Sequence, residues 1–323
     1  MKKSRLSLEE VLAHPMVEAL NPYHQDFISL RWLSSNLNPF RLEEDIDIAA
    51  AITFGTLPHI KTVAAFGMLK EDFENGVYEG IDTLVVPSSG NTAHAVALLA
   101  PAFGIPRVKL IMSSDTPESK QSVIRMLPQA SVMNPDGKRS VEDVAFEESS
   151  RPGHHLLDQY KHLGNVLAHR ECTGPQLLNA AGEGLGLVAV SMGSGGTVTG
   201  ISQYLKSKDP NIIVIGVRPS PGQRVPGVRD LARMNAVVSL PYREAVDDIV
   251  ELSREESFQT ARDFMSEVYP TPGPSSGLAY AGLKKYLREH ALLVKSLRGK
   301  KALFVCPDDV RFYSAQMAST IDY

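Results

Sequence analysis

The feature that most constrains this chain is a glycine-rich loop between a strand-like and a helix-like segment. The loop, Gly193-Ser194-Gly195-Gly196-Thr197, follows the apolar stretch LVAVSM. Such a loop presents backbone amides and the positive end of a helix dipole, which together bind anions. The chain lacks the lysine of a nucleotide P-loop, and Val198 replaces the last glycine of a dinucleotide fingerprint. The loop predicts a phosphate site of another kind, with a purely structural turn as the alternative.

A second loop has the same design. Ser88-Ser89-Gly90-Asn91-Thr92 follows the strand-like TLVVP and begins a helix. Its hydroxyls and amides suit a carboxylate, and the Asn91 amide can meet a phenolic oxygen or a carbonyl. Simple helix capping is the alternative. Two anion loops in one chain favour a ligand with two anionic groups.

The pattern from about Pro58 onward alternates short apolar strands with helices, which predicts parallel sheet. The expected strands are DTLVVP, VKLIMS, LVAVSM, IIVIGVRP and KALFVCP. The expected helices are HIKTVAAFGMLKEDFE, HAVALLAPAFG, ESKQSVIRMLPQ, ISQYLKSK, SREESFQTARDFMSEVY and LAYAGLKKYLREH. Residues 20–60 show no clear period, and residues 219–243 contain enough Pro and Gly to predict a functional loop without a continuous element. No linker divides the chain, so its domains are expected to interleave.

Lys61 lies on the apolar face of its predicted helix. The residues three, four, seven and eight positions further on are Ala64, Ala65, Met68 and Leu69. Burial favours the neutral amine, which is the form that condenses with an aldehyde. A lysine that extends outward into solvent is the alternative.

Two serines precede the predicted helix at Leu278. They belong to Gly273-Pro274-Ser275-Ser276-Gly277, and either serine can cap that helix. The functional alternative places a neutral hydroxyl against a ring nitrogen of a cofactor.

The composition favours a protein that acts on small molecules. The chain has 323 residues, of which 43% are hydrophobic and 22% charged, and a formal net charge of -4. This charge provides no general attraction for nucleic acid or an anionic membrane. Cys172 and Cys306 are too few for a disulfide framework or a thiolate zinc site, so no metal is expected. No apolar stretch reaches the roughly 20 residues of a membrane span, and the N-terminus does not resemble a signal peptide, which favours a cytoplasmic protein.

These segments, in this order, resemble the cysteine synthase and cystathionine β-synthase family, the fold type II pyridoxal-phosphate enzymes. The resemblance covers roughly residues 55 to 315 and is most specific in MGSGGTVTGISQYLKSKDPNIIVIGVRP, which is similar to the family's phosphate-loop unit. SSGNTAHAVALLA resembles the substrate-carboxylate loop, GPSSGLAYAGL the GISSGA segment, LLDQYKHLGNVLAH the LLQQFSNPAN segment, and CPDDVRFY the closing PDSVRNY stretch.

The resemblance implies a role for each site residue. Asn91 and Gly193 to Thr197 contact the cofactor, and Ser275 is its pyridine-nitrogen partner. Ser88 to Thr92 and Gln159 bind the substrate. The family's imine lysine lies thirty residues before the loop asparagine, which is Lys61 here. Lys61 is therefore selected both by its helix face and by this spacing.

The implied fold is α/β, with two interleaved domains that each contain a parallel sheet flanked by helices. Residues 56–162 form the smaller domain, and residues 1–55 plus 163–323 form the larger domain with the phosphate loop. The implied reaction is pyridoxal 5'-phosphate-dependent β-replacement on a serine- or cysteine-type amino acid through an aminoacrylate, in a homodimer. Lys61 forms the imine and then removes the α-proton.

The sequence also departs from the family. GTLPHIKTV stands where the family has NPxGSxKDR, which leaves the substrate open. RVPGVRDLAR resembles a PGIRR stretch of the second cysteine synthase isozyme type, so Arg229, or else Arg224, is a candidate for an anionic leaving group or nucleophile, with a solvated surface loop as the alternative. Three other functions stay open: β-elimination, as in a cysteine desulfhydrase; a dehydratase or threonine synthase-like activity; and a non-catalytic binding protein that keeps the fold.

Overall fold

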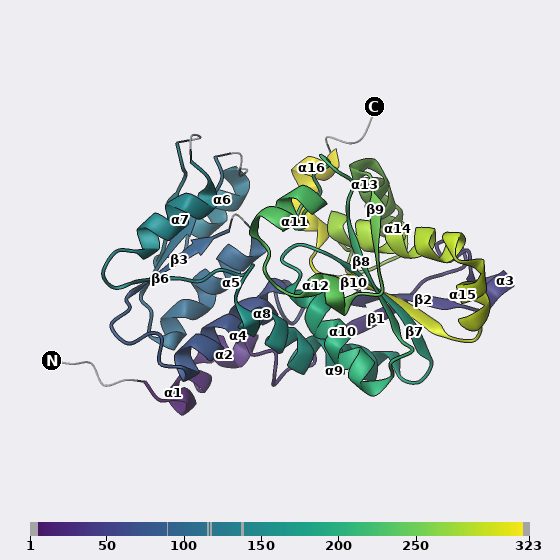
Figure 1. Ribbon diagram of the computed structural model, residues 1–323, viewed down its shortest axis with the longest axis horizontal. Helices are drawn as coiled ribbons and strands as arrows, with labels where there is room; N and C mark the ends of the chain where they lie inside the picture. The colour runs from purple at the N-terminus through teal and green to yellow at the C-terminus, as the bar shows by residue number, and fades with distance from the viewer. Residues whose placement is uncertain (1–5, 89, 115, 117, 137–138, 319–323) are drawn as a thin grey trace. The chain divides into compact units, whose positions relative to one another are not determined.

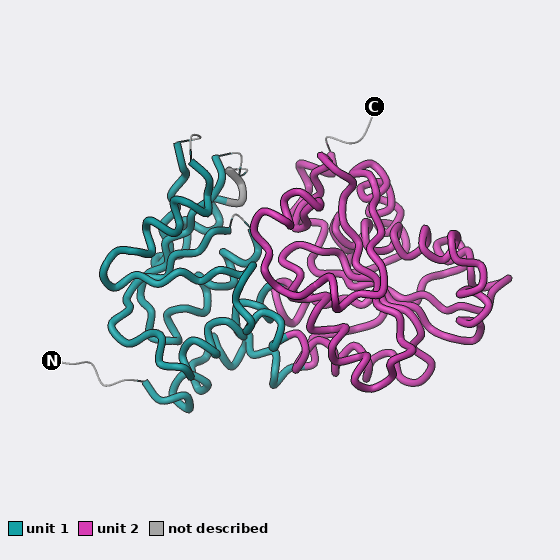
Figure 2. Tube along the Cα trace, viewed as in Figure 1, with its two compact units in different colours: residues 1–25, 61–168 teal, residues 26–60, 169–323 magenta. Residues whose placement is uncertain are grey.

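The computed structural model describes residues 6–88, 90–114, 116, 118–136 and 139–318 and divides the chain into two compact units (Figure 2). Unit 1 comprises residues 1–25 and 61–168, and unit 2 comprises residues 26–60 and 169–323. The chain thus enters each unit twice. Residues 1–25 group with unit 1, whereas the functional division expected from the sequence assigns them to the larger domain; that functional division stays a prediction.

Unit 1 is built on a four-stranded sheet of order β5-β4-β3-β6, in which every pairing is parallel. Strands β3 and β6 of this sheet are labelled in Figure 1. The strands are β3 (Thr83–Pro87), β4 (Arg107–Ile111), β5 (Ala130–Met133) and β6 (His154–Leu156). The helices are α1 (Leu8–Leu12), α2 (Pro15–Leu20), α4 (Lys61–Glu74), α5 (Asn91–Leu99), the 3₁₀ turn η1 (Ala100–Phe103), α6 (Glu118–Arg125), α7 (Val141–Ser149) and α8 (Leu163–Ala168). All five residues of β3 are buried, as expected for an inner strand covered on both faces.

Unit 2 is built on a six-stranded sheet of order β1-β2-β10-β7-β8-β9. The strands are β1 (Ser29–Trp32), β2 (Asp47–Ile52), β7 (Leu185–Ser191), β8 (Ile213–Pro219), β9 (Asp248–Leu252) and β10 (Lys301–Cys306). All neighbours are parallel except β1, which pairs antiparallel with β2. The sheet is therefore parallel, as expected, except at the edge strand β1, which makes it a mixed sheet.

Helices cover both faces of the six-stranded sheet. They are α3 (Arg41–Glu44), the π-helical η2 (His169–Thr173), α9 (Gly174–Ala181), α10 (Gly196–Lys208), α11 (Leu231–Val237), α12 (Tyr242–Ala245), α13 (Arg254–Asp263), the 3₁₀ turn η3 (Phe264–Ser266), α14 (Pro274–Glu289), α15 (Ala291–Ser296), the 3₁₀ turn η4 (Val310–Tyr313) and α16 (Ser314–Ala318). Alternate strand residues point to opposite faces. In β8, Val217 packs in the core that contains α14, whereas Val214 packs in the core that contains α9 and α10.

The predicted α/β class is confirmed, and the helices and strands expected from about Pro58 onward are present. Two details differ. The segment without a clear period contains β1 and β2, and residues 219–243 contain α11 and the start of α12. Among the described residues, no helix is both long enough and apolar enough to cross a bilayer.

Candidate active site

The glycine loop connects β7 to α10 in unit 2. Gly195 is the N-cap of α10 with φ +84°, a left-handed conformation that favours glycine. A Cβ on Gly195 would lie 3.0 Å from the Tyr242 Cβ, so a side chain there would also be crowded. No side chain caps the first turn of α10. The first turn of a helix exposes N–H groups that can bind an anion, and the phosphate role of this loop stays a prediction.

A buried histidine holds the last residue of this loop. The Thr197 hydroxyl lies 3.0 Å from His169 Nε2, and His169 Nδ1 lies 2.8 Å from the Thr173 hydroxyl. All three side chains are buried. This chain of hydrogen bonds fixes the orientation of Thr197 before any ligand binds.

Ser275 and Ser276 lie in the first turn of α14, and both are buried. The N-cap residue is Gly273, which offers no side chain. Neither serine therefore caps the helix, which removes the simpler alternative for this segment. The Ser276 hydroxyl lies near the buried Cys306 thiol and interacts with it. The pyridine-nitrogen role of Ser275 stays a prediction.

Arg229 lies in the loop between β8 and α11. Its N–H donates to the carbonyl of Met192, the residue just before the glycine loop, at 3.0 Å. Asp230 caps α11 and pairs with Arg233 at 3.2 Å, and the hydrogen bond from Arg233 lowers the pKa of this carboxyl group. The loop that carries Arg229 is thus fastened beside the glycine loop.

Lys61 is the first residue of α4 in unit 1. It is half-buried, and Ala64, Ala65, Met68 and Leu69 are all fully buried, as its predicted helix face requires. The amino end of a helix carries partial positive charge, which disfavours an ammonium group there. This position suits an amine that must react in its neutral form.

The structure joins two parts of the predicted substrate site that are far apart in the sequence. Thr92, in the first turn of α5, donates its hydroxyl to Gln159 Oε1 at 2.8 Å, and both residues are buried. Because Oε1 accepts this bond, the N–H donors of Gln159 Nε2 are not used by Thr92. The N-cap of α5 is Gly90, with no side-chain cap, and Asn91 is the first helical residue. Ser88 directly follows β3, and Ser89 lies outside the described residues.

The sequence did not reveal the side chains that hold the segment around Gln159 in place. The pattern LLDQYKH showed Gln159 but gave no sign that His155 and His162, on either side of it, contact Asp72 of α4. Such contacts depend on residues more than eighty positions away and leave no local signal. His59, two residues before Lys61, is buried in unit 2 and packs edge-on against Phe312, with ring centroids 6.5 Å apart.

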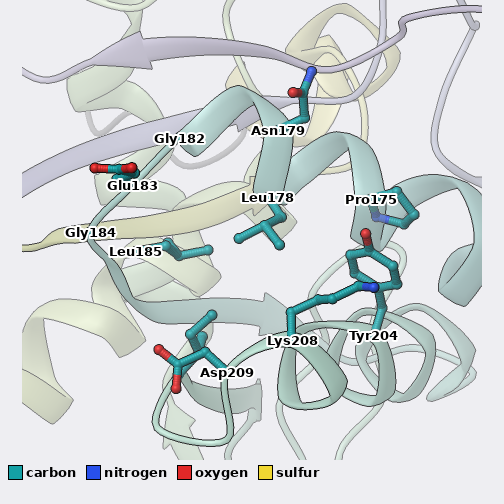
Figure 3. Close-up of a pocket in the computed structure, with 11 residues that line it drawn as sticks. Pro175, Leu178, Asn179, Gly182, Glu183, Gly184, Leu185, Tyr204, Lys208 and Asp209 are labelled. Carbon is teal, nitrogen blue, oxygen red and sulfur yellow. The ribbon is translucent and has the colours of Figure 1, made fainter.

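A groove of about 540 Å³ lies near the amino end of β7, between α9 and α10 (Figure 3). Its lining includes Leu178, Glu183, Tyr204 and Lys208. None of the predicted site residues lines it. The groove is therefore separate from the carboxyl ends of the strands, where the glycine loop begins.

Comparisons with known proteins agree with these features. The sequence profile of the family described as "Pyridoxal-phosphate dependent enzyme" matches residues 60–308. Cysteine synthase B of Escherichia coli is 28% identical over 225 residues, which cover 69% of this chain and 74% of that protein. Cystathionine beta-synthase of Mus musculus is 30% identical over 278 residues, which cover 80% of this chain but only 48% of that longer protein.

Two solved structures share the fold. O-ureido-L-serine synthase aligns with a TM-score of 0.79 at 22% identity and covers 95% of each chain. O-acetylserine dependent cystathionine beta-synthase from Helicobacter pylori aligns with a TM-score of 0.76 at 24% identity and covers 93% of this chain and 96% of that chain. These likenesses confirm the predicted fold type. Because the family profile spans most of the chain, this protein belongs to the pyridoxal-phosphate dependent enzymes and its cofactor is pyridoxal phosphate.

Proposed function

We propose that this enzyme catalyses β-replacement on a serine- or cysteine-type amino acid, as in cysteine synthases. The hydrogen bond from Thr92 to Gln159 carries this proposal, because it prepares a carboxylate-binding amide beside the α5 amino end in unit 1, which also contains Lys61. Relatives named cysteine synthase B and cystathionine beta-synthase support the same reaction class.

The residues divide the work as follows. Bound pyridoxal phosphate supplies an electron sink for the carbanion at Cα. Lys61 Nζ would hold the cofactor and would accept the α-proton of the substrate. The N–H groups after Gly193 would hold the phosphate, and the Ser275 hydroxyl would be the partner of the pyridine nitrogen. Asn91 would be the partner of the ring oxygen.

The substrate carboxylate is assigned to the α5 amino end and Gln159. Ser88 to Thr92 supply N–H and hydroxyl donors, and Gln159 Nε2 supplies the opposing N–H group. Arg229 is assigned to the negative charge of the leaving group or of the second substrate. Its place in a loop fastened at Met192 supports this role.

Product analysis tests the reaction. We expect purified enzyme given O-acetyl-L-serine or O-phospho-L-serine plus sulfide or a thiol to release a new amino acid with a sulfur-carbon bond. Pyruvate and ammonia without such a product would instead assign β-elimination. Omission of the second substrate is the control, because replacement requires it and elimination does not.

Replacing Thr92 tests the carboxylate site. Thr92→Val keeps the shape of the side chain but removes the donor to Gln159 Oε1. We expect KM for the amino acid to rise about fivefold, the effect of one neutral hydrogen bond, with kcat nearly unchanged. Thr83→Val, which removes a buried hydroxyl that donates to Asp82 Oδ1 at 2.7 Å at the start of β3, is the matched control in unit 1. An unchanged KM in Thr92→Val would separate Gln159 from substrate binding.

The enzyme is further proposed to act as a homodimer in the cytoplasm. Cys172 and Cys306 form no disulfide among the described residues and are both buried, which fits a reducing compartment. Light scattering after gel filtration would give the mass of the assembly, and a monomer mass of 35.2 kDa at micromolar concentration would contradict the dimer.

A further inference from the structure

A buried carboxylate on the Lys61 helix contacts two histidines that flank Gln159. Asp72 lies near the end of α4 and is 7% exposed. Its Oδ2 lies 3.0 Å from His155 Nε2, and its Oδ1 lies 2.9 Å from His162 Nε2. His155 belongs to β6, and His162 immediately precedes α8. Both carboxylate oxygens are therefore held by side chains of the segment that contains Gln159.

The surrounding backbone defines which nitrogen of His162 is protonated. The Gly164 N–H donates to His162 Nδ1 at 3.1 Å, so Nδ1 is an acceptor and the proton is on Nε2, facing Asp72. Glu71 Oε2 lies 3.5 Å from the same Nδ1. Burial tends to raise the pKa of Asp72, but the hydrogen bonds from His155 and His162 lower this pKa to about 2. Asp72 is thus an ionised acceptor for both histidines.

The segment between the histidines is anchored on several sides. Leu157 N–H donates to the carbonyl of Val85 in β3 at 2.9 Å, and the Gln159 carbonyl accepts from Asn165 Nδ2 at 2.8 Å. Asp158 Oδ1 accepts from the Tyr160 N–H at 2.9 Å and closes a turn. Together these bonds tie the segment to the sheet and to α8, and the histidines tie it to α4.

Helix α8 also packs on α4 through two glycines. A Cβ on Gly67 would lie 2.4 Å from the carbonyl oxygen of Gly164, so the two backbones approach closely there. Asp72 lies little more than one helical turn after Gly67 on α4. The clasp formed by Asp72, His155 and His162 therefore lies beside this close helix contact.

We propose that Asp72 is a positioning residue for substrate recognition, because its bonds to His155 and His162 fix the segment from which Gln159 binds the substrate carboxylate. The inference rests on the proposed function of Gln159. A hydrogen-bonding side chain discriminates between ligands only when its supports hold it in place, and a shift of about 1 Å is enough to lose the bond. The Asp72 clasp supplies that support from the helix that begins with Lys61.

Amino-acid binding to the holoenzyme tests this inference. The probes are L-serine and L-serine methyl ester, followed by the change in the visible spectrum of the cofactor, because the ester lacks the carboxylate. For Asp72→Asn we expect L-serine to bind about tenfold more weakly, the effect of lost charge-assisted hydrogen bonds, with ester binding nearly unchanged. Equal losses for acid and ester, or no loss for either, would overturn the positioning role.

Two further variants separate positioning from general destabilisation. His162→Gln can still donate an N–H to Asp72 and should retain serine binding, whereas His162→Leu should lose it about as Asp72→Asn does. Glu148→Gln is the matched control, because Glu148 is also a buried carboxylate of unit 1 and pairs with Lys109 at 2.6 Å outside this segment. It should leave the ratio of acid to ester binding unchanged.

Hydrogen exchange gives a readout that needs no turnover. In Asp72→Asn, amides of residues 157–165 should exchange about fivefold faster or more, whereas those of β4 should not change. Unaltered exchange in residues 157–165 would contradict the clasp. If L-serine leaves the wild-type spectrum unchanged, the proposed function fails instead, and the exchange result still decides the role of Asp72.

Discussion

At the scale of single residues, Lys61 combines three properties that a covalent cofactor anchor needs. It begins a helix, it is half-buried, and the next turns of that helix are fully buried. We expect Lys61→Ala to abolish fixation of the cofactor by borohydride and to lower kcat/KM about a thousandfold, since both the covalent link and the base are lost.

A second lysine on the same helix provides the control for this prediction. Lys70 lies on α4 but forms an ion pair with Glu74 at 2.8 Å. Lys70→Ala should keep the visible cofactor band and nearly full activity, because exposed ion pairs contribute little. Peptide mapping after reduction identifies the modified residue directly, and a label on any lysine other than Lys61 would refute the anchor.

At the scale of helices and strands, the contact of α4 with α8 leaves no room for a side chain at Gly67. A Cβ there would lie 2.4 Å from both the Ala168 Cβ and the Gly164 carbonyl oxygen. Gly67→Ala should therefore lower the free energy of unfolding by about 1–3 kcal/mol despite the better helix propensity of alanine. Denaturant titration followed by circular dichroism measures the change.

Gly80→Ala separates crowding from backbone strain. Gly80 has φ +79° but no atom within 4 Å of an added Cβ, so only the strain of about 1 kcal/mol applies. If Gly67→Ala lowers the free energy of unfolding no more than Gly80→Ala does, then α4 and α8 can move apart easily.

The amino end of α13 is closed by a serine cap. Ser253 accepts from the Glu256 N–H at 3.1 Å, and the Glu256 carboxylate accepts from the Ser253 N–H at 2.8 Å, which forms a capping box. Ser253→Ala should cost about 1 kcal/mol in the same titration. Ser296→Ala, at an exposed hydroxyl near the end of α15, should cost much less.

Elements with strong local signals were predictable, and those that depend on distant partners were not. The glycine loop and Lys61 lie at the starts of helices with clear apolar faces, and these helix starts could be predicted from the sequence alone. Strand β2 reads DIAAAI, and its alanines carry no strand preference; its strand conformation depends on pairing with β10 and β1. The Thr92–Gln159 and Asp72–His155 contacts arise only when β3 and β6 pair. No spacing rule within one segment reveals such contacts.

At the scale of the whole molecule, the chain crosses between its two units three times, yet each unit keeps its own sheet and core. Each half of the predicted site belongs to one unit: Lys61, Asn91 and Gln159 to unit 1, and the glycine loop and Ser275 to unit 2. A substitution in unit 1 can therefore change the stability of that unit without altering any residue of unit 2. The dependence of the free energy of unfolding on acid pH is a useful test of such a substitution.

Asp72 should make unit 1 sensitive to acid. Its pKa of about 2 in the folded state lies below the value of about 3.9 expected in an unfolded chain. Because the folded pKa is lowered, the ionised carboxylate stabilises the fold above the unfolded value, and this contribution of about 2 kcal/mol is lost as pH falls from about 4 to about 2. The free energies of unfolding of wild type and Asp72→Asn should therefore differ most above pH 4 and converge toward pH 2.

Urea titrations at each pH measure both free energies of unfolding, with Asp47→Asn as a control at an exposed carboxylate of unit 2. A difference that stays constant down to pH 2 would show that the histidines do not hold Asp72 in its ionised form.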